Sequence, residues 1–230
     1  MSTGQSNYMM WKGWETFGQI DARNGRRFAA ECTRSGLKAP SKLLEIGFGA
    51  GTFLRWARDN GYGIVGIEQD GELLKRARLN NFLAHDSLSE AATEAPNGFD
   101  GVVAFDVIEH LSEEQFRGML EELGRIMRPQ AKAIFQFPNG SSPLVGHIFN
   151  GDLTHKMLYT RNSLEQLLIT SPFVLVGWHQ PYPVTDTGLK GSAMRAIRAV
   201  IFRLLGGFSR LLNGADVDWW PVAIAVLQLR

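Results

Sequence analysis

The residues best suited to chemistry form a glycine-rich turn after an apolar run. Glu45 lies near the end of the run, and Gly47, Gly49 and Gly51 follow at alternate positions before a helical pattern. Glycines at this spacing let the backbone turn sharply off a strand and let a ligand approach the main chain at a helix N-terminus. The turn therefore predicts a nucleotide-like ligand at the carboxyl edge of a parallel sheet.

The spacing of the glycines separates two ligand classes. A dinucleotide fingerprint would place its third glycine at position 52, which is Thr52. Here the third glycine comes one residue earlier, and an acid lies two residues before the first. The pattern resembles the first motif of the class I S-adenosylmethionine-dependent methyltransferases, acid-x-Gly-x-Gly-x-Gly. The resemblance implies S-adenosylmethionine as the cofactor, bound through Glu45, Gly47, Gly49 and Gly51.

Three later segments extend the predicted cofactor site. Glu68 ends the apolar run 63–67, where a carboxylate is placed to accept hydrogen bonds from both ribose hydroxyls. In the methyltransferases an acid after the third strand holds the adenine amino group, and Asp86 matches that place. The resemblance also places Phe105 and Asp106, at the end of the fourth strand, beside the cofactor.

Candidate catalytic residues follow the fifth strand. Residues 151–160 resemble a stretch of small-molecule and sugar O-methyltransferases, which implies His155 as a general base with Asp152 as its orienting partner. The alternative is a histidine that only holds its loop in place. The pair Glu109–His110 is interpreted as structural, at the head of the following helix.

The order of apolar runs predicts an α/β fold. Strands are expected at 42–46, 63–67, 81–84, 100–105, 131–137, 173–178 and 222–227, with helices at 22–35, 51–60, 71–79, 112–127 and 163–168. Alternation of strands and helices indicates a doubly wound, mostly parallel sheet. The resemblance implies seven strands in a Rossmann-like methyltransferase fold, the final strand antiparallel beside strand five.

The chain is expected to be one methyltransferase domain, residues 1–230. Residues 1–40 would be a helical lead-in or lid, 41–137 the cofactor-binding core, and 138–230 the acceptor side with the last strands. Ser112 is the expected N-cap of the helix before Pro129.

Composition excludes some partners and sites. The net charge of +1 provides no global field for nucleic acid. The single cysteine, Cys32, excludes an internal disulfide, fits a reducing compartment and is expected to be buried. No signal peptide or membrane-length apolar run is evident, so we expect a cytoplasmic protein. Five scattered histidines show no usual ligand spacing, so no metal site is predicted.

Residues 190–213 predict an amphipathic helix. Arg195, Arg198, Arg203 and Arg210 collect opposite an apolar face, and the segment contains no acid. Such a helix suits the surface of an anionic membrane, where lipid-linked acceptors are found. Packing on the sheet or against a second subunit in a homodimer is the favoured interpretation of the apolar face.

These observations predict methyl transfer from S-adenosylmethionine to an oxygen of a small or lipid-linked polar acceptor, such as a sugar. One alternative is an NAD(P)-dependent oxidoreductase on a related fold, which the glycine spacing and Glu45 disfavour. The other is a non-catalytic protein that binds S-adenosylmethionine.

Overall fold

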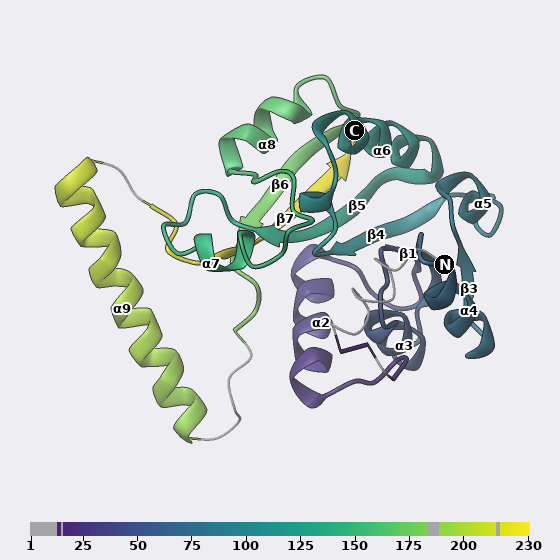
Figure 1. Cartoon of the computed structure of the whole chain (residues 1–230), viewed down its shortest axis with the longest axis horizontal. Helices are drawn as coiled ribbons and strands as arrows, with labels where there is room; N and C mark the ends of the chain where they lie inside the picture. The colour runs from purple at the N-terminus through teal and green to yellow at the C-terminus, as the bar shows by residue number, and fades with distance from the viewer. Residues whose placement is uncertain (1–12, 15, 184–188, 215–216) are drawn as a thin grey trace.

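A computed structural model describes residues 13–14, 16–183, 189–214 and 217–230 of the 230-residue chain. Its centre is a seven-stranded sheet with the strand order β3-β2-β1-β4-β5-β7-β6 (Figure 1). The strands are β1 (Lys42–Ile46), β2 (Gly63–Ile67), β3 (Leu83–His85), β4 (Phe99–Phe105), β5 (Met127–Pro138), β6 (Phe173–His179) and β7 (Val222–Leu229).

Strands β1 to β5 pair in parallel, whereas β7 is antiparallel to both β5 and β6. The described helices are α2 (Ala22–Ser35), α3 (Thr52–Asp59), α4 (Gly71–Leu79), α5 (Leu88–Ala92), η1 (Ile108–His110), α6 (Glu113–Ile126), α7 (Gly146–Phe149), α8 (Arg161–Leu168) and α9 (Leu189–Asn213). The predicted doubly wound sheet with an antiparallel last strand is confirmed.

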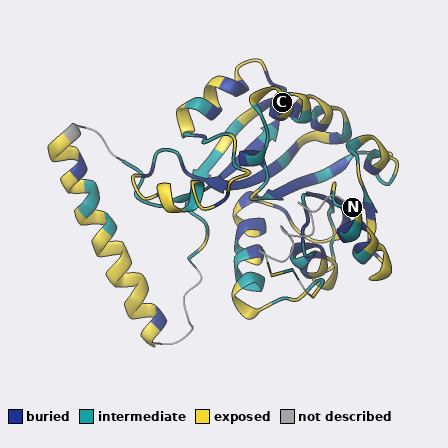
Figure 2. Ribbon diagram, in the orientation of Figure 1, coloured by how far each residue is buried: buried dark blue, intermediate teal, exposed yellow. Residues whose placement is uncertain are grey.

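Alternate residues of the central strands enter two hydrophobic cores, because successive side chains of a strand point to opposite faces. Leu44 and Phe135 belong to one core, together with Phe116 and Leu120 of α6. The other core joins the intervening strand residues to α2, α3 and α4: Leu43, Val103, Ile134, Phe28, Phe53 and Leu73. Figure 2 shows the central strands buried between these helices. Cys32 of α2 is buried as expected, which raises the pKa of its thiol to about 12.

Local boundaries follow cap and turn chemistry. Ser112 caps α6, and its hydroxyl accepts a hydrogen bond from the amide of Gln115 at 3.2 Å. Strand β5 begins at Met127, earlier than expected, because that residue pairs with Phe99 of β4 before a register shift. The start of β3 is later than expected, since Asn81 adopts a left-handed turn conformation with φ of 60°.

The long helix α9 departs most from expectation. It stands apart from the sheet in Figure 1, and Figure 2 shows it as largely exposed. The favoured prediction was that its apolar face packs on the sheet or against a second subunit. Packing on the sheet is wrong, because the apolar side chains of α9 are exposed and other helices already cover both faces of the central strands, whereas packing against a second subunit stays a prediction. Within the described ranges, no helix is both long and apolar enough to cross a bilayer.

Candidate functional site

The glycine turn between β1 and α3 adopts backbone conformations that only glycine accepts easily. Gly47, Gly49 and Gly51 have φ values of 67°, 50° and 70°. The amide of Gly47 donates to the carbonyl of Ile67 at 2.8 Å, which ties the turn to β2. A Cβ atom on Gly47 would lie 2.6 Å from Val107 Cγ2. The turn is therefore fixed in shape by its contacts with β2 and Val107.

The chain before α2 covers this turn. A Cβ atom on Gly49 would lie 2.9 Å from the ring of Trp14. The amide of Gly18 donates to the carbonyl of Ala50 at 2.6 Å, and Arg76 Nη1 donates to the carbonyl of Trp14 at 2.8 Å. This part of the expected lead-in lies across the glycine turn; residues 1–12 lie outside the described residues.

The carboxylate of Glu68 is held against the turn by backbone amides. Its Oε2 atom accepts from Gly49 at 3.0 Å, and its Oε1 atom accepts from Gln69 at 2.8 Å and from Asp70 at 3.2 Å. A carboxylate offers about four acceptor positions. These three bonds orient the carboxylate, and its predicted bonds to both ribose hydroxyls stay a prediction.

Glu45 provides a second acid beneath the turn. Its side chain is buried, and within the described residues its Oε2 atom has no hydrogen-bond partner. Burial and then repulsion from Glu68 raise its pKa well above 4.5, although a hydrogen bond from the Leu54 amide opposes the shift. A cationic ligand would relieve this repulsion. The glycine turn and the two acids therefore fit a ligand that combines a nucleoside with a positive charge.

The other predicted cofactor residues gather at the same carboxyl edge. Asp86 is exposed directly after β3. Phe105 ends β4 and stacks on Phe28 with a centroid separation of 5.4 Å. Asp106 has a left-handed φ of 56°, and its two carboxylate oxygens accept from Gln136 Nε2 at 3.0 and 3.1 Å. Asp106 is thereby oriented at the end of β4.

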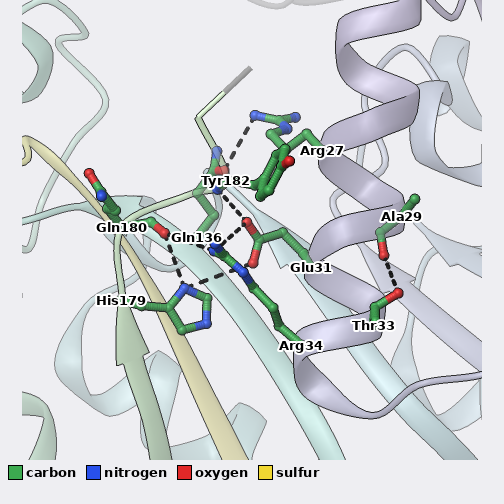
Figure 3. Close-up of polar contacts among 9 residues, drawn as sticks. All are labelled: Arg27, Ala29, Glu31, Thr33, Arg34, Gln136, His179, Gln180 and Tyr182. Carbon is green, nitrogen blue, oxygen red and sulfur yellow. Dashed lines mark hydrogen bonds and ion pairs between the residues drawn. The ribbon is translucent and has the colours of Figure 1, made fainter. Parts of the chain in front are cut away.

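A polar network that the sequence did not reveal ties α2 to this edge (Figure 3). Arg27 Nη1 donates to Gln136 Oε1 at 3.3 Å, which extends the contact to Asp106. Burial lowers the pKa of Arg27, and the nearby acids oppose this shift, with Asp106 making the largest opposing contribution. The buried carboxylate of Glu31 accepts from the amide of Tyr182 at 2.5 Å. No sequence spacing links these residues, because they come from α2, β5 and the segment after β6.

The candidate base His155 lies in a cluster with Glu109 and His110. Its Nδ1 atom lies 2.8 Å from the carbonyl oxygen of Phe149, and its Nε2 atom lies 3.9 Å from Glu109 Oε1. Since a carbonyl only accepts, Nδ1 carries the proton and the neutral ring keeps its lone pair on Nε2. The backbone carbonyl of Glu109 also accepts from Lys156 at 2.7 Å, so η1 supports the loop.

The carboxylate of Asp152 contacts Thr154. The sequence predicted that Asp152 orients His155, which stays a prediction: the Nδ1 atom of that ring lies against the Phe149 carbonyl and its Nε2 atom lies near Glu109. Asp152 Oδ1 accepts from the hydroxyl of Thr154 at 2.6 Å, and this hydroxyl lies 2.9 Å from His110 Nδ1. The threonine hydroxyl has one proton, and it donates that proton in the hydrogen bond to Asp152. His110 Nδ1 must therefore be the donor in its hydrogen bond to the threonine oxygen.

The same cluster bears on metal binding. One ligand atom each from Glu109, His110 and His155 lies within 4.8 Å of the others. Carboxylate oxygen and imidazole nitrogen are common ligands of divalent metals, so these three side chains could hold an ion. Sequence spacing could not reveal this group, because folding brings His155 to a pair on another element.

Comparisons with known proteins agree with this geometry. A sequence profile described as a methyltransferase domain matches residues 19–176. The chain is 22% identical over 205 residues to the ubiquinone biosynthesis O-methyltransferase of Klebsiella pneumoniae, a match covering 85% of this chain and 80% of the relative.

Two solved structures illustrate the likeness in fold. A SAM-dependent methyltransferase from Archaeoglobus fulgidus aligns with a TM-score of 0.63 and 20% identity, over 90% of this chain and 94% of the other. The magnesium protoporphyrin IX methyltransferase from Synechocystis with bound SAH aligns with a TM-score of 0.57 and 12% identity, over 100% and 95% of the two chains. At these identities the likeness establishes the fold.

Proposed function

Because the chain belongs to the methyltransferase-domain family, we propose that it transfers the methyl group of S-adenosylmethionine to an oxygen of a small or lipid-linked polar acceptor, such as a sugar. The observation that carries this proposal is the fixed glycine turn with Glu45 and Glu68 beside it. The names of the Klebsiella and Archaeoglobus proteins support oxygen as the acceptor atom and S-adenosylmethionine as the cofactor.

Several residues would hold the cofactor. Gly47, Gly49 and Gly51 would form the turn that receives it, and Glu68 would accept from both ribose hydroxyls. Glu45 would face the ammonium group of its amino-acid end. Asp86 would contact the adenine amino group, and Phe105 with Asp106 would border the ring from the end of β4. Bound there, S-adenosylmethionine supplies an activated methyl group.

His155 is the proposed general base. Its proton on Nδ1 is directed to Phe149, so Nε2 can accept the hydroxyl proton of the acceptor as the new carbon–oxygen bond forms. The carboxylate of Glu109, 3.9 Å from Nε2, would stabilise the imidazolium that results. Such a base adds to the rate that alignment of acceptor and methyl group provides.

The acceptor side also contains exposed apolar residues. Leu153, next to the Thr154–His155 pair, is fully exposed, and Leu144 of the same loop is 46% exposed. Exposed leucines beside a polar cluster suit an acceptor with a polar reacting group and an apolar tail. This combination supports a lipid-linked acceptor.

Two measurements test the proposal. Calorimetry should detect binding of S-adenosylmethionine and its demethylated product, and tight binding of NAD alone would contradict the cofactor assignment. Purified enzyme with methyl-labelled cofactor should then label a component of a lipid or sugar extract. The His155→Ala variant is the matched control, because it should bind the cofactor but transfer little label.

A further inference from the structure

We propose that α9 docks the enzyme on an anionic lipid surface, lying in the plane of the headgroups. The helix carries a continuous row of apolar side chains at intervals of three or four residues, which places them on one face. These side chains are exposed: Met194 58%, Ile197 52%, Ile201 49%, Leu204 69%, Phe208 54% and Leu211 83%. An exposed apolar row of this length indicates an interaction surface that is covered by an apolar partner.

The charge of α9 selects the partner. Arg195, Arg198, Arg203 and Arg210 are exposed on the other side of the helix, and the segment contains no acidic residue. With its apolar row at the acyl boundary, the helix would place its arginines at the level of lipid phosphates. A second copy of α9 has no acidic residue to pair with these arginines, whereas anionic lipids supply phosphates, so charge complementarity favours an anionic bilayer over self-association.

The position of α9 in the fold relates this surface to the site. The helix is inserted between β6 and β7, which end and begin at the carboxyl edge of the sheet. Val222, the first residue of β7, pairs with Pro138 at the end of β5. Docking through α9 would therefore bring the edge that carries His155 toward the lipid. This consequence rests on the proposed function, whereas the docking itself does not.

Co-sedimentation with lipid vesicles tests the docking without any assay of activity. The full chain should sediment with phosphatidylglycerol-containing vesicles at low salt and far less with phosphatidylcholine vesicles. Arg195→Gln/Arg198→Gln/Arg203→Gln should weaken binding about 100-fold, because each basic residue near an anionic surface contributes about fivefold. The difference in vesicle binding between wild type and this variant should become smaller as the salt concentration rises.

Two variants distinguish the lipid surface from other causes. Lys38→Gln/Lys75→Gln/Arg125→Gln removes the same charge from exposed positions on the body and should bind vesicles like wild type. Ile197→Glu/Leu204→Glu changes two exposed positions of the apolar row, so the chain should fold normally yet remain in the supernatant. Hydrogen exchange should show vesicle-dependent protection in α9.

Several outcomes would overturn the docking. Wild type that stays in the supernatant at low salt would do so, as would equal binding to neutral vesicles. A lipid-free dimer that Ile197→Glu/Leu204→Glu converts to monomers would assign the face to a second copy. Loss of vesicle binding in the body-charge control would show that net charge alone is responsible. Methyl transfer can fail while docking succeeds, which separates this inference from the proposed function.

Discussion

The amide of Gly49 donates a hydrogen bond to the carboxylate of Glu68 over 3.0 Å. This bond joins the middle glycine of the turn to the acid that follows β2. The two motifs that the sequence presents as separate signals therefore form one unit. Glu68 therefore helps to shape the turn, and we propose that it also accepts from the ribose of the ligand.

Replacing Glu68 should weaken the cofactor. Glu68→Ala removes the acceptor proposed for ribose and the three amide contacts that orient it. We expect a loss of about 1–3 kcal/mol in binding free energy, the usual cost when a charged hydrogen-bond partner is removed. Calorimetry with the demethylated cofactor measures it. Gln69→Ala, an exposed neighbour, is the control, and equal affinity in both variants would contradict the assignment.

The turn should reject a side chain at Gly47. In Gly47→Ala the left-handed backbone conformation of residue 47 would cost about 1–2 kcal/mol. The new Cβ atom would also lie only 2.6 Å from Val107 Cγ2. In a Val107→Ala background the contact disappears and only the strain remains. We expect a coupling of about 0.5–3 kcal/mol in the free energy of unfolding, from urea titrations of the four proteins. Additive costs would show that Val107 does not limit this position.

The sequence predicted the core of the fold well because local pattern determines it. Buried strands, acids at their ends and glycines at a sharp turn are all signals within a few residues, and Glu45, Gly49 and Glu68 lie together as expected at the turn. The packing of α9 could not be predicted, because an apolar face does not say what covers it.

Contacts between segments that are distant in the chain could not be predicted from the sequence either. His110 meets Thr154 only after β4 and the loop after β5 reach the same edge. The bond between Arg27 and Gln136 likewise depends on how α2 crosses the sheet. The contact of the His155 Nδ1 atom with the backbone carbonyl of Phe149 could not be predicted either, because a backbone carbonyl has no sequence signature.

The buried acid Glu45 should make stability depend on pH. Its pKa is raised in the folded chain, so the folded state keeps a proton that the unfolded state releases once pH exceeds about 4.5. Stability from this group is complete below that pH and falls as pH rises, by up to about 1.4 kcal/mol per unit, until Glu45 ionises in the fold.

The isosteric variant Glu45→Gln tests this dependence. It cannot titrate, so its free energy of unfolding should fall less between pH 5 and 8 than that of wild type. Urea denaturation at each pH measures the difference, which should widen as pH rises. Parallel profiles would mean that Glu45 ionises with its ordinary pKa. Saturating cofactor should narrow the difference between the two pH profiles if its ammonium group faces Glu45.

The two histidines of the cluster should differ in their effect on rate. If His155 takes the proton of the acceptor, His155→Ala should lower turnover by about 10²–10⁴ and leave cofactor affinity nearly unchanged. Equal loss of turnover and affinity would mean that His155 only holds the loop through Phe149. Single-turnover rates and calorimetry on the same preparation separate these outcomes.

Thr154→Val is the matched test of the neighbouring ring. It keeps the shape of the side chain but removes the hydroxyl that lies between Asp152 and His110. With His155 as the base, this variant should lose far less turnover than His155→Ala, because the ring at position 155 keeps its bond to Phe149. A larger loss in Thr154→Val and His110→Ala than in His155→Ala would reassign the base to His110. In that case the pair Asp152–Thr154 would set the tautomer of the reacting ring, and the pH profile of Thr154→Val should shift while that of His155→Ala should not.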